Sequence, residues 1–267
     1  MTQDDLIQRV TGDVAKLPQV RALFLGGSYA RGSADAYSDI DLIALVDADH
    51  HAEIAARWRL ILENITRVVF WNEQGRDAVL LNAITYEWLR CDMLIIAPPA
   101  FASRAKNLVR PLVDPEGFFD RLPPALDRKA PDAGRVAYLI NEFIRVLGLL
   151  SVVVGRAEYL VAVTGAGHLR EHLTNLMLEE ISPPDRGGAL HLSRLLPARH
   201  MDVLHALPFP TPERASVIEA HIAVARQFFP RARALASNLG IVWPEEFETA
   251  TRDHLQRALG DQNDISW

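Results

Sequence analysis

Apolar and polar positions follow two different patterns along the chain. In about the first hundred residues, segments with apolar positions at helical spacing alternate with short apolar runs typical of strands. From about Pro131 onward, only the helical spacing recurs. The pattern predicts an α/β (α+β) N-terminal domain with a mixed sheet, followed by an all-α helical domain.

The expected elements of the first half are helices over residues 2–17 and 52–65 and strands over residues 20–25, 40–46, 67–71, 79–85 and 88–96. The second half predicts helices over residues 134–154, 160–181, 190–207, 212–239 and 244–259. The segment Pro111–Pro131 is rich in Pro and Asp, which is typical of a junction. We therefore expect one domain over residues 1–115 and a second over residues 116–267.

Composition narrows the class of protein. The chain has 267 residues, 49% of them hydrophobic, and a formal net charge of -6. This charge favours neither nucleic acid nor an anionic membrane surface as a partner, so any nucleotide substrate is expected to be small. The single cysteine, Cys91, excludes a disulfide within the chain, and the acidic N-terminus does not resemble a signal peptide. We expect a cytoplasmic protein.

The most apolar stretch, residues 136–155, is interrupted by Asn141, Glu142 and Arg145. A charged residue at the centre of a membrane-spanning helix costs roughly 2.5 to 3.5 kcal/mol on an insertion scale. We therefore interpret this stretch as a buried helix of a globular domain and expect no membrane partner.

The first candidate site is the run Gly26, Gly27 and Ser28, which follows an expected strand. Two glycines let the backbone approach a ligand closely, and the N–H groups beyond them can bind an anion. By itself such a run also fits an ordinary tight turn.

Asp39 and Asp41 lie two residues apart at the start of the next expected strand, so their side chains project from the same face. Neighbouring carboxylates repel one another unless a cation neutralises them, and Mg²⁺ favours carboxylate and phosphate oxygens. A solvated acidic strand end is the alternative. The buried character of residues 42–46 favours a functional pair.

Asp92 is an acid within the otherwise apolar strand expected over residues 88–96. A buried carboxylate needs a partner. If this strand lies beside the one that carries Asp39 and Asp41, the three carboxylates converge. They would then hold two metal ions, or one metal ion with the third carboxylate as a general base.

The sequence Gly-Gly-Ser-Tyr-Ala-Arg-Gly-Ser-Ala-Asp-Ala-Tyr-Ser-Asp-Ile-Asp-Leu, over residues 26–42, resembles a signature of the nucleotidyltransferase superfamily that includes DNA polymerase beta. The resemblance is closer to its small-molecule branch, the antibiotic and minimal nucleotidyltransferases. It covers about the first hundred residues. The helical half resembles the C-terminal domains of aminoglycoside adenylyltransferases in layout only.

This resemblance implies transfer of a nucleoside monophosphate from a nucleoside triphosphate, usually ATP, to a hydroxyl, with release of pyrophosphate. It implies that Asp39 and Asp41 bind Mg²⁺ and that Asp92 either binds metal or accepts the proton of the hydroxyl. It further implies that Gly26, Gly27 and Ser28 hold the triphosphate. Arg31 and Ser38 would either contact a phosphate or support the residues that do.

The acceptor expected from the resemblance is a small molecule, an aminoglycoside-type antibiotic first. Glu142, on an apolar helix, either forms a structural ion pair with an Arg such as Arg145 or binds a cationic acceptor. Transfer to a macromolecule such as a tRNA or a protein, and a non-catalytic nucleotide-binding module, stay open as alternatives. The sequence does not indicate the oligomeric state.

His168, Glu171 and His172 have the His-x-x-Glu-His spacing of some zinc peptidases. A pattern this short arises easily by chance. We interpret these residues as surface positions of the helical half.

Overall fold

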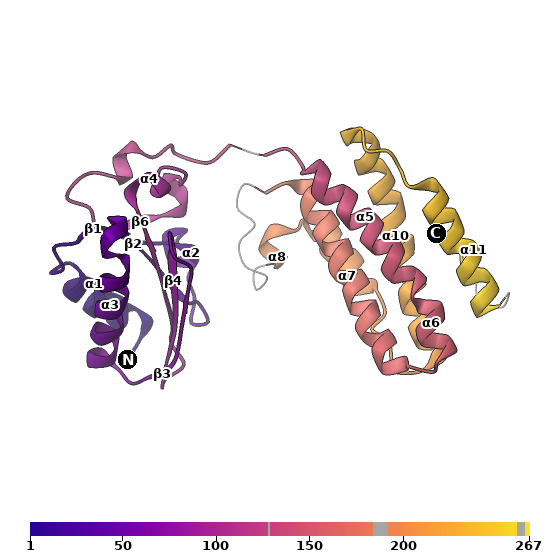
Figure 1. Ribbon diagram of the computed structural model, residues 1–267, viewed down its shortest axis with the longest axis horizontal. Coiled ribbons are helices and arrows are strands. Elements are labelled where there is room, and N and C mark those ends of the chain that lie inside the picture. The colour runs from indigo at the N-terminus through magenta and orange to yellow at the C-terminus, as the bar shows by residue number, and fades with distance from the viewer. Residues whose placement is uncertain (128, 184–191, 261–264) are drawn as a thin grey trace. The chain divides into compact units, whose positions relative to one another are not determined.

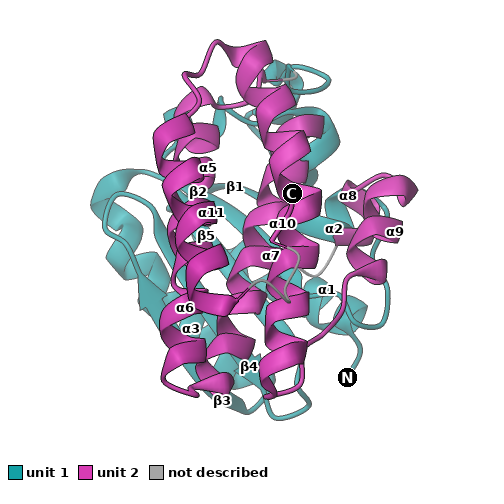
Figure 2. Cartoon of the chain, turned by 90° about the vertical axis from the view of Figure 1, so that its right-hand side faces the viewer, with its two compact units in different colours: residues 1–127 teal, residues 128–267 magenta. Residues whose placement is uncertain are grey.

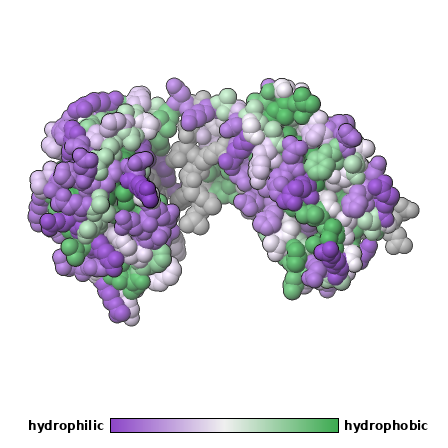
Figure 3. Space-filling view, in the orientation of Figure 1, coloured by the Kyte–Doolittle hydropathy of each residue, from purple (hydrophilic) through white to green (hydrophobic). Residues whose placement is uncertain are grey.

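The structure, a computed structural model, describes residues 1–127, 129–183, 192–260 and 265–267. The chain forms two compact units, residues 1–127 and residues 128–267 (Figure 2). The first unit combines a sheet with helices and the second is helical, which confirms the predicted fold class. Hydrophilic side chains cover much of the face of each unit that Figure 3 shows, with apolar side chains scattered among them.

The sheet of the first unit has six strands in the order β3-β4-β5-β2-β1-β6 (Figure 1). β2 and β5 run parallel, and the other neighbouring strands run antiparallel. The sheet is therefore mixed. Its strands are β1 (Val20–Leu25), β2 (Ile40–Val46), β3 (Val68–Gln74), β4 (Val79–Thr85), β5 (Arg90–Ile96) and β6 (Arg110–Val113).

Helices α1 (Gln3–Val14) and α3 (His51–Ile65) cover one face of this sheet (Figure 1). α1 begins with a capping box, in which the Thr2 hydroxyl accepts a hydrogen bond from the Asp5 N–H and the Asp5 carboxylate accepts one from the Thr2 N–H. Trp58 of α3 is fully buried against the strands. The apolar side of each helix thus packs against the sheet and stabilises it.

Short helical segments pack on part of the opposite face. α2 (Gly27–Ala30) follows β1 directly, and α4 (Pro98–Phe101) follows β5. The rings of Phe24 and Phe101 stack with centroids 4.4 Å apart. The remaining segments are the 3-10 helices η1 (Ala48–His50), η2 (Lys106–Leu108) and η3 (Phe119–Arg121).

The division between the units lies after residue 127, whereas the sequence pattern placed it after residue 115. Phe118 and Leu122 account for the difference, because both are buried with Phe101 in the core on the second face of the sheet. The Pro- and Asp-rich segment therefore begins as part of the first unit.

The second unit is built from helices α5 (Ala133–Gly148), α6 (Leu150–Gly155), α7 (Tyr159–Ile181), α8 (Leu192–Leu195), α9 (Ala198–Ala206), α10 (Arg214–Leu239) and α11 (Glu245–Leu259). Phe143 of α5 stacks on Phe228 of α10 with centroids 3.7 Å apart, and Phe229 meets Phe143 edge-on. The expected helix 134–154 changes at Leu149, whose N–H bonds three residues back to Val146. Residues 190 and 191 of the expected helix 190–207 lie outside the described residues.

The stretch Ala133–Gly155, which spans α5 and α6, is long and apolar enough to cross a membrane by length and composition. Val136, Ile140 and Phe143 of α5 are fully buried in the core of the helical unit. Packing within the bundle therefore accounts for the apolar side of this helix.

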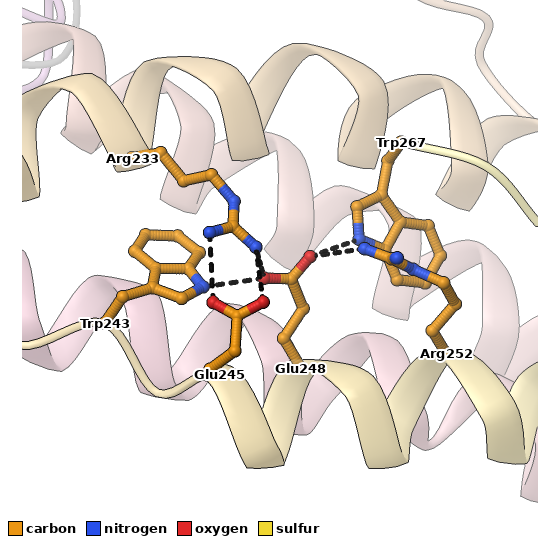
Figure 4. Close-up of polar contacts among 6 residues, drawn as sticks. All are labelled: Arg233, Trp243, Glu245, Glu248, Arg252 and Trp267. Atoms are coloured by element: carbon orange, nitrogen blue, oxygen red, sulfur yellow. Dashed lines mark hydrogen bonds and ion pairs between the residues drawn. The ribbon is translucent and has the colours of Figure 1, made fainter.

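Glu248 of α11 is a buried carboxylate that binds the end of the chain (Figure 4). It accepts hydrogen bonds from the Trp243 indole at 2.7 Å, from Arg252 at 2.6 Å, from the Trp267 indole at 3.0 Å and from Arg233. Because a buried charge is costly without partners, this saturated carboxylate joins α10, α11 and the terminal residue.

Candidate active site

Three carboxylates meet at one end of β2 and β5. Asp39 directly precedes β2, Asp41 is its second residue, and Asp92 is the third residue of β5. The parallel pairing places Asp41 opposite Asp92. Side chains of paired residues project from the same face, and neighbouring strands lie about 4.8 Å apart. The condition under which the sequence places the carboxylates together, that these two strands are neighbours, is thus met.

The Gly26–Ser28 run connects β1 to α2 beside Asp41. The Gly26 N–H donates a hydrogen bond to the Asp41 backbone oxygen at 2.8 Å. Gly27 has a φ of +53°, and a Cβ added there would lie 1.8 Å from Asp41 Oδ2. The Asp41 carboxylate therefore occupies the space that any other side chain at position 27 would need.

Ser28 is buried, with 2% of its surface exposed. Its hydroxyl oxygen has no hydrogen-bond partner within the described part of the chain. Buried polar atoms are normally paired, so a lone hydroxyl next to the glycine turn is a feature to be explained by function. A phosphate oxygen or a metal-bound water is a suitable partner.

Two residues that the sequence pattern did not single out contact the carboxylates. The Asn82 side chain on β4 donates a hydrogen bond to Asp92 Oδ2 at 2.8 Å. The Arg90 guanidinium on β5 lies 3.6 Å from Asp39 Oδ2 and donates to the Tyr37 backbone oxygen at 2.7 Å. Arg90 was detectable in principle because it is two residues before Asp92 and shares its face. Asn82 could be recognised as a site residue only once the order of the strands was known.

The electrostatics of the cluster favour protonation. Burial, together with the charges of Asp39 and Asp92, raises the pKa of the Asp41 carboxyl to about 6. Arg31 and Arg90 act in the opposite direction. Burial likewise raises the pKa of Asp92, against the hydrogen bond from Asn82. Like charges and desolvation both disfavour the ionised forms until a cation is present.

Arg31 and Ser38, the other residues predicted for the triphosphate site, lie in the segment between α2 and β2. Arg31 follows α2, and its charge lowers the pKa of Asp41. The Ser38 hydroxyl donates to Asp35 Oδ1 at 3.0 Å and accepts from the Asp35 N–H at 2.9 Å. Ser38 therefore closes the loop that leads into β2. A phosphate contact for Ser38 stays a prediction.

Glu142 belongs to α5 of the second unit, and its carboxylate accepts two hydrogen bonds from Arg145, at 2.8 and 2.6 Å. This ion pair lowers the pKa of Glu142. The structural pairing considered from the sequence is thus present. His168 Nδ1 lies 4.0 Å from the carboxylate of Glu171, and both side chains are exposed.

The donor set of the three aspartates suits a hard divalent cation, because all its atoms are carboxylate oxygens whose charges repel one another. Over the described ranges, no group of three His, Cys, Asp or Glu side chains is already arranged to ligate a metal ion. Magnesium binding by Asp39, Asp41 and Asp92 is accordingly a proposal.

Cys91 lies between Arg90 and Asp92 on β5 but faces the helix-covered core, where it is fully buried. Burial raises the pKa of its thiol, which leaves it protonated and unreactive. It is a core residue.

A cavity of about 600 Å³ opens elsewhere on the first unit. Its lining includes Arg21 at the start of β1, Asp47 after β2 and Ala97 after β5. These positions are at the opposite ends of the strands from the carboxylates. The cavity is therefore separate from the candidate active site.

The strand β1, the Gly-Gly-Ser turn and the facing Asp-x-Asp strand form one compact structural unit. Residues 7–79 match the family model described as nucleotidyltransferase domain, a range that includes the glycine turn and Asp39 and Asp41. The first unit therefore carries a nucleotidyltransferase domain.

Solved structures with a similar fold include an aminoglycoside 6-adenyltransferase from Bacillus subtilis, with 14% identity, a TM-score of 0.45, and coverage of 95% of this chain and 98% of that one. A nucleotidyltransferase-like protein from Exiguobacterium sibiricum 255-15 has 13% identity, a TM-score of 0.41, and coverage of 96% and 88%.

The CCA-adding enzyme of Thermotoga maritima, solved in complex with tRNA, has 12% identity, a TM-score of 0.32, and coverage of 96% of this chain and 70% of that one. No curated protein matches the sequence significantly. At these identities and TM-scores, the three structures carry no argument about the substrate.

Proposed function

We propose that the protein transfers a nucleoside monophosphate from a nucleoside triphosphate, ATP first, to a hydroxyl of a small molecule, with release of pyrophosphate. The leading acceptor is an aminoglycoside-type antibiotic, which would make the enzyme a resistance factor. The observation that carries the proposal is the contact of the Gly27 turn with Asp41, whose strand neighbour is Asp92.

In the proposed reaction the acceptor oxygen attacks the α-phosphorus. A phosphorus–oxygen bond to the acceptor forms, the bond to the bridging oxygen of pyrophosphate breaks, and the hydroxyl proton passes to a carboxylate. Asp92 suits this role, because its raised pKa lets it hold a proton and Asn82 fixes its orientation. Gly26, Gly27 and Ser28 would bind the triphosphate.

Asp39 and Asp41 would hold Mg²⁺, which when bound supplies charge neutralisation at the phosphates. The neutralisation also offsets the repulsion that raises the pKa of Asp41. Arg90 holds Asp39 and the preceding loop in place. These residues position and neutralise, which is the greater part of catalysis in phosphoryl transfer.

Glu142, on α5 of the helical unit, is proposed as a substrate-binding residue. In this proposal the Glu142 carboxylate receives an ammonium group of a cationic acceptor in competition with Arg145. The formal net charge of -6 supports a small cationic acceptor over a nucleic acid, and we retain a cytoplasmic location as part of the proposal.

The experiment incubates the full chain with each nucleoside triphosphate, Mg²⁺ and a panel of aminoglycosides, and measures pyrophosphate. Acceptor-dependent release is the expected result. Release only with tRNA or a protein acceptor would replace the small-molecule proposal. Metal-dependent triphosphate binding without release with any acceptor would indicate a non-catalytic module.

A further inference from the structure

Four polar residues form a row across four adjacent strands. Asp41 on β2 pairs with Asp92 on β5, Asp92 pairs with Asn82 on β4, and Asn82 pairs with Asn72 on β3. We call these four residues the polar row. With strands about 4.8 Å apart, Asn72 lies three spacings, roughly 14 Å, from Asp41. The row begins at the glycine turn and extends away from it.

The side chains of the row share the face opposite α1 and α3. Trp71 precedes Asn72, and the Arg59 guanidinium of α3 lies 5.5 Å from the centre of its ring, so Trp71 faces the helices. Because successive side chains alternate, Asn72 faces the other way, with the carboxylates. Its carboxamide makes no side-chain hydrogen bond to any described residue and is partly exposed.

Partly exposed apolar side chains flank the far end of the row. Phe70 on β3 pairs with Ile84 on β4. Phe70 is two residues before Asn72 and is 48% exposed, and Ile84 is two residues after Asn82. The only acid of β3 and β4 is Glu73, whose partner Leu81 is buried on the helix-covered face. Neither strand therefore places an acid on this face, where the carboxamides lie beside an apolar surface. The neighbouring charge is that of Arg90, which pairs with Ile84.

We propose that the row continues the active site into an acceptor subsite that binds a hydroxylated sugar ring. The carboxamides of Asn82 and Asn72 would exchange hydrogen bonds with ring hydroxyls, and Phe70 and Ile84 would contact the C–H face of the ring. A carboxamide both donates and accepts, as a hydroxyl does, whereas an ammonium group requires acceptors only. The inference rests on the proposed function and specifies a hydroxylated sugar ring as the part of the acceptor that binds here.

It follows that the ring that receives the nucleotidyl group is recognised by its hydroxyls, and amino groups of the same acceptor bind elsewhere. Asn82 has two roles in this proposal. One of its N–H groups donates a hydrogen bond to Asp92, and its other N–H group and its oxygen would bind the ring hydroxyls. Asn72 has no such second task and is the specific marker of the subsite.

The test compares Asn72→Ala with Gln74→Ala in the full chain. Gln74 is an exposed amide on the same strand and pairs with Leu80, outside the row. Loss of one well-placed hydrogen bond corresponds to about tenfold in binding. Asn72→Ala is expected to raise the acceptor KM about tenfold with unchanged triphosphate affinity, and Gln74→Ala to leave both unchanged. An acceptor KM within twofold of wild type in Asn72→Ala would overturn the subsite.

A second measurement separates the subsite from the reaction. The side-chain amide NMR signals of Asn72 and Asn82 are followed as each aminoglycoside of the panel, and the neutral sugar trehalose, are added to the protein with ATP and Mg²⁺. Shifts of both signals without pyrophosphate would retain the subsite and remove the proposed transfer. Pyrophosphate without such shifts would retain the transfer and overturn the subsite, and neither result would overturn both.

Discussion

A Cβ atom at Gly27 would lie 1.8 Å from Asp41 Oδ2, so the glycine turn and the aspartate occupy one another's space. The contact joins the end of β1 to β2 at the point where Asp92 is the strand neighbour. The two parts of the sequence signature are thus parts of one structural unit, and changing either is expected to affect the other.

Gly27→Ala is predicted to abolish metal-dependent triphosphate binding, because the added methyl group displaces the Asp41 carboxylate. Gly32→Ala is the matched control. Gly32 also has a positive φ, of +68°, but an added Cβ there meets nothing within 4 Å. Both variants carry the backbone cost of about 1 kcal/mol for a left-handed alanine. Equal triphosphate affinities in the two variants, measured by calorimetry, would show that the contact with Asp41 has no role.

Asp41→Asn is predicted to stabilise the metal-free protein at neutral pH. The folded pKa of Asp41, about 6, lies above its ordinary value of 3.8, so the folded state binds more protons between these values. Its contribution to stability is therefore present at low pH and is lost as the pH rises through 6. Allowing for partial solvent screening, we expect a gain of up to about 2 kcal/mol at pH 8.

Urea unfolding at pH 4 and pH 8 measures this effect, with Asp77→Asn, an exposed acid in the β3–β4 turn, as the control. The difference between Asp41→Asn and wild type is expected to shrink to about 0.5 kcal/mol near pH 4, where the folded wild-type side chain is protonated and the unfolded one is about half ionised. A destabilised Asp41→Asn protein at pH 8 would contradict the repulsion inferred for the cluster.

Asn82→Leu is predicted to shift the acid limb of the pH profile of kcat/KM to higher pH. The hydrogen bond from Asn82 lowers the pKa of Asp92, so its removal raises that pKa. A general base must be unprotonated, and the variant therefore needs a higher pH to reach its maximum rate. A lower rate with an unmoved acid limb would assign Asn82 to a role other than support of Asp92.

Trp267→Ala is predicted to destabilise the helical unit by about 3 kcal/mol, since it removes a stacked ring and a hydrogen bond to a buried charge. Its ring lies 5.1 Å from that of Phe229, and its indole donates to Glu248 (Figure 4). Trp267→Phe keeps the stacking and is expected to lose about half as much. Thermal unfolding compares the stabilities of the two variants and wild type. If both variants are as stable as wild type, Trp267 has no stabilising role.

Local pattern was sufficient to predict a mixed sheet with helices in the first half and a helical second half. Residues two apart on a strand share a face, and an apolar run with an acid at its start predicts a buried strand with a polar end. Asp39 and Asp41 are of this kind, and Asp92 is an acid within an otherwise apolar strand. The sequence left open whether the strands of Asp41 and Asp92 are neighbours, and the structure pairs them.

Residues that depend on tertiary neighbours were not predictable in the same way. Asn82 reaches Asp92 only because β4 lies beside β5, and Asn72 joins the row only because β3 lies beside β4. The partner of the Ser38 hydroxyl, Asp35, is likewise not revealed by the motif. Side-chain partners across strands and loops are set by the assembled fold.

The most direct test of the account compares pyrophosphate release by wild type, Asp41→Asn and Asp77→Asn under identical conditions with ATP, Mg²⁺ and the acceptor that supports turnover. Loss of a metal-binding carboxylate at the reacting phosphates is expected to lower the rate by at least about a hundredfold. We predict Mg²⁺-dependent release by wild type and Asp77→Asn and its loss in Asp41→Asn. Pyrophosphate release by Asp41→Asn at the wild-type rate would contradict the assignment of Asp41 to the active site.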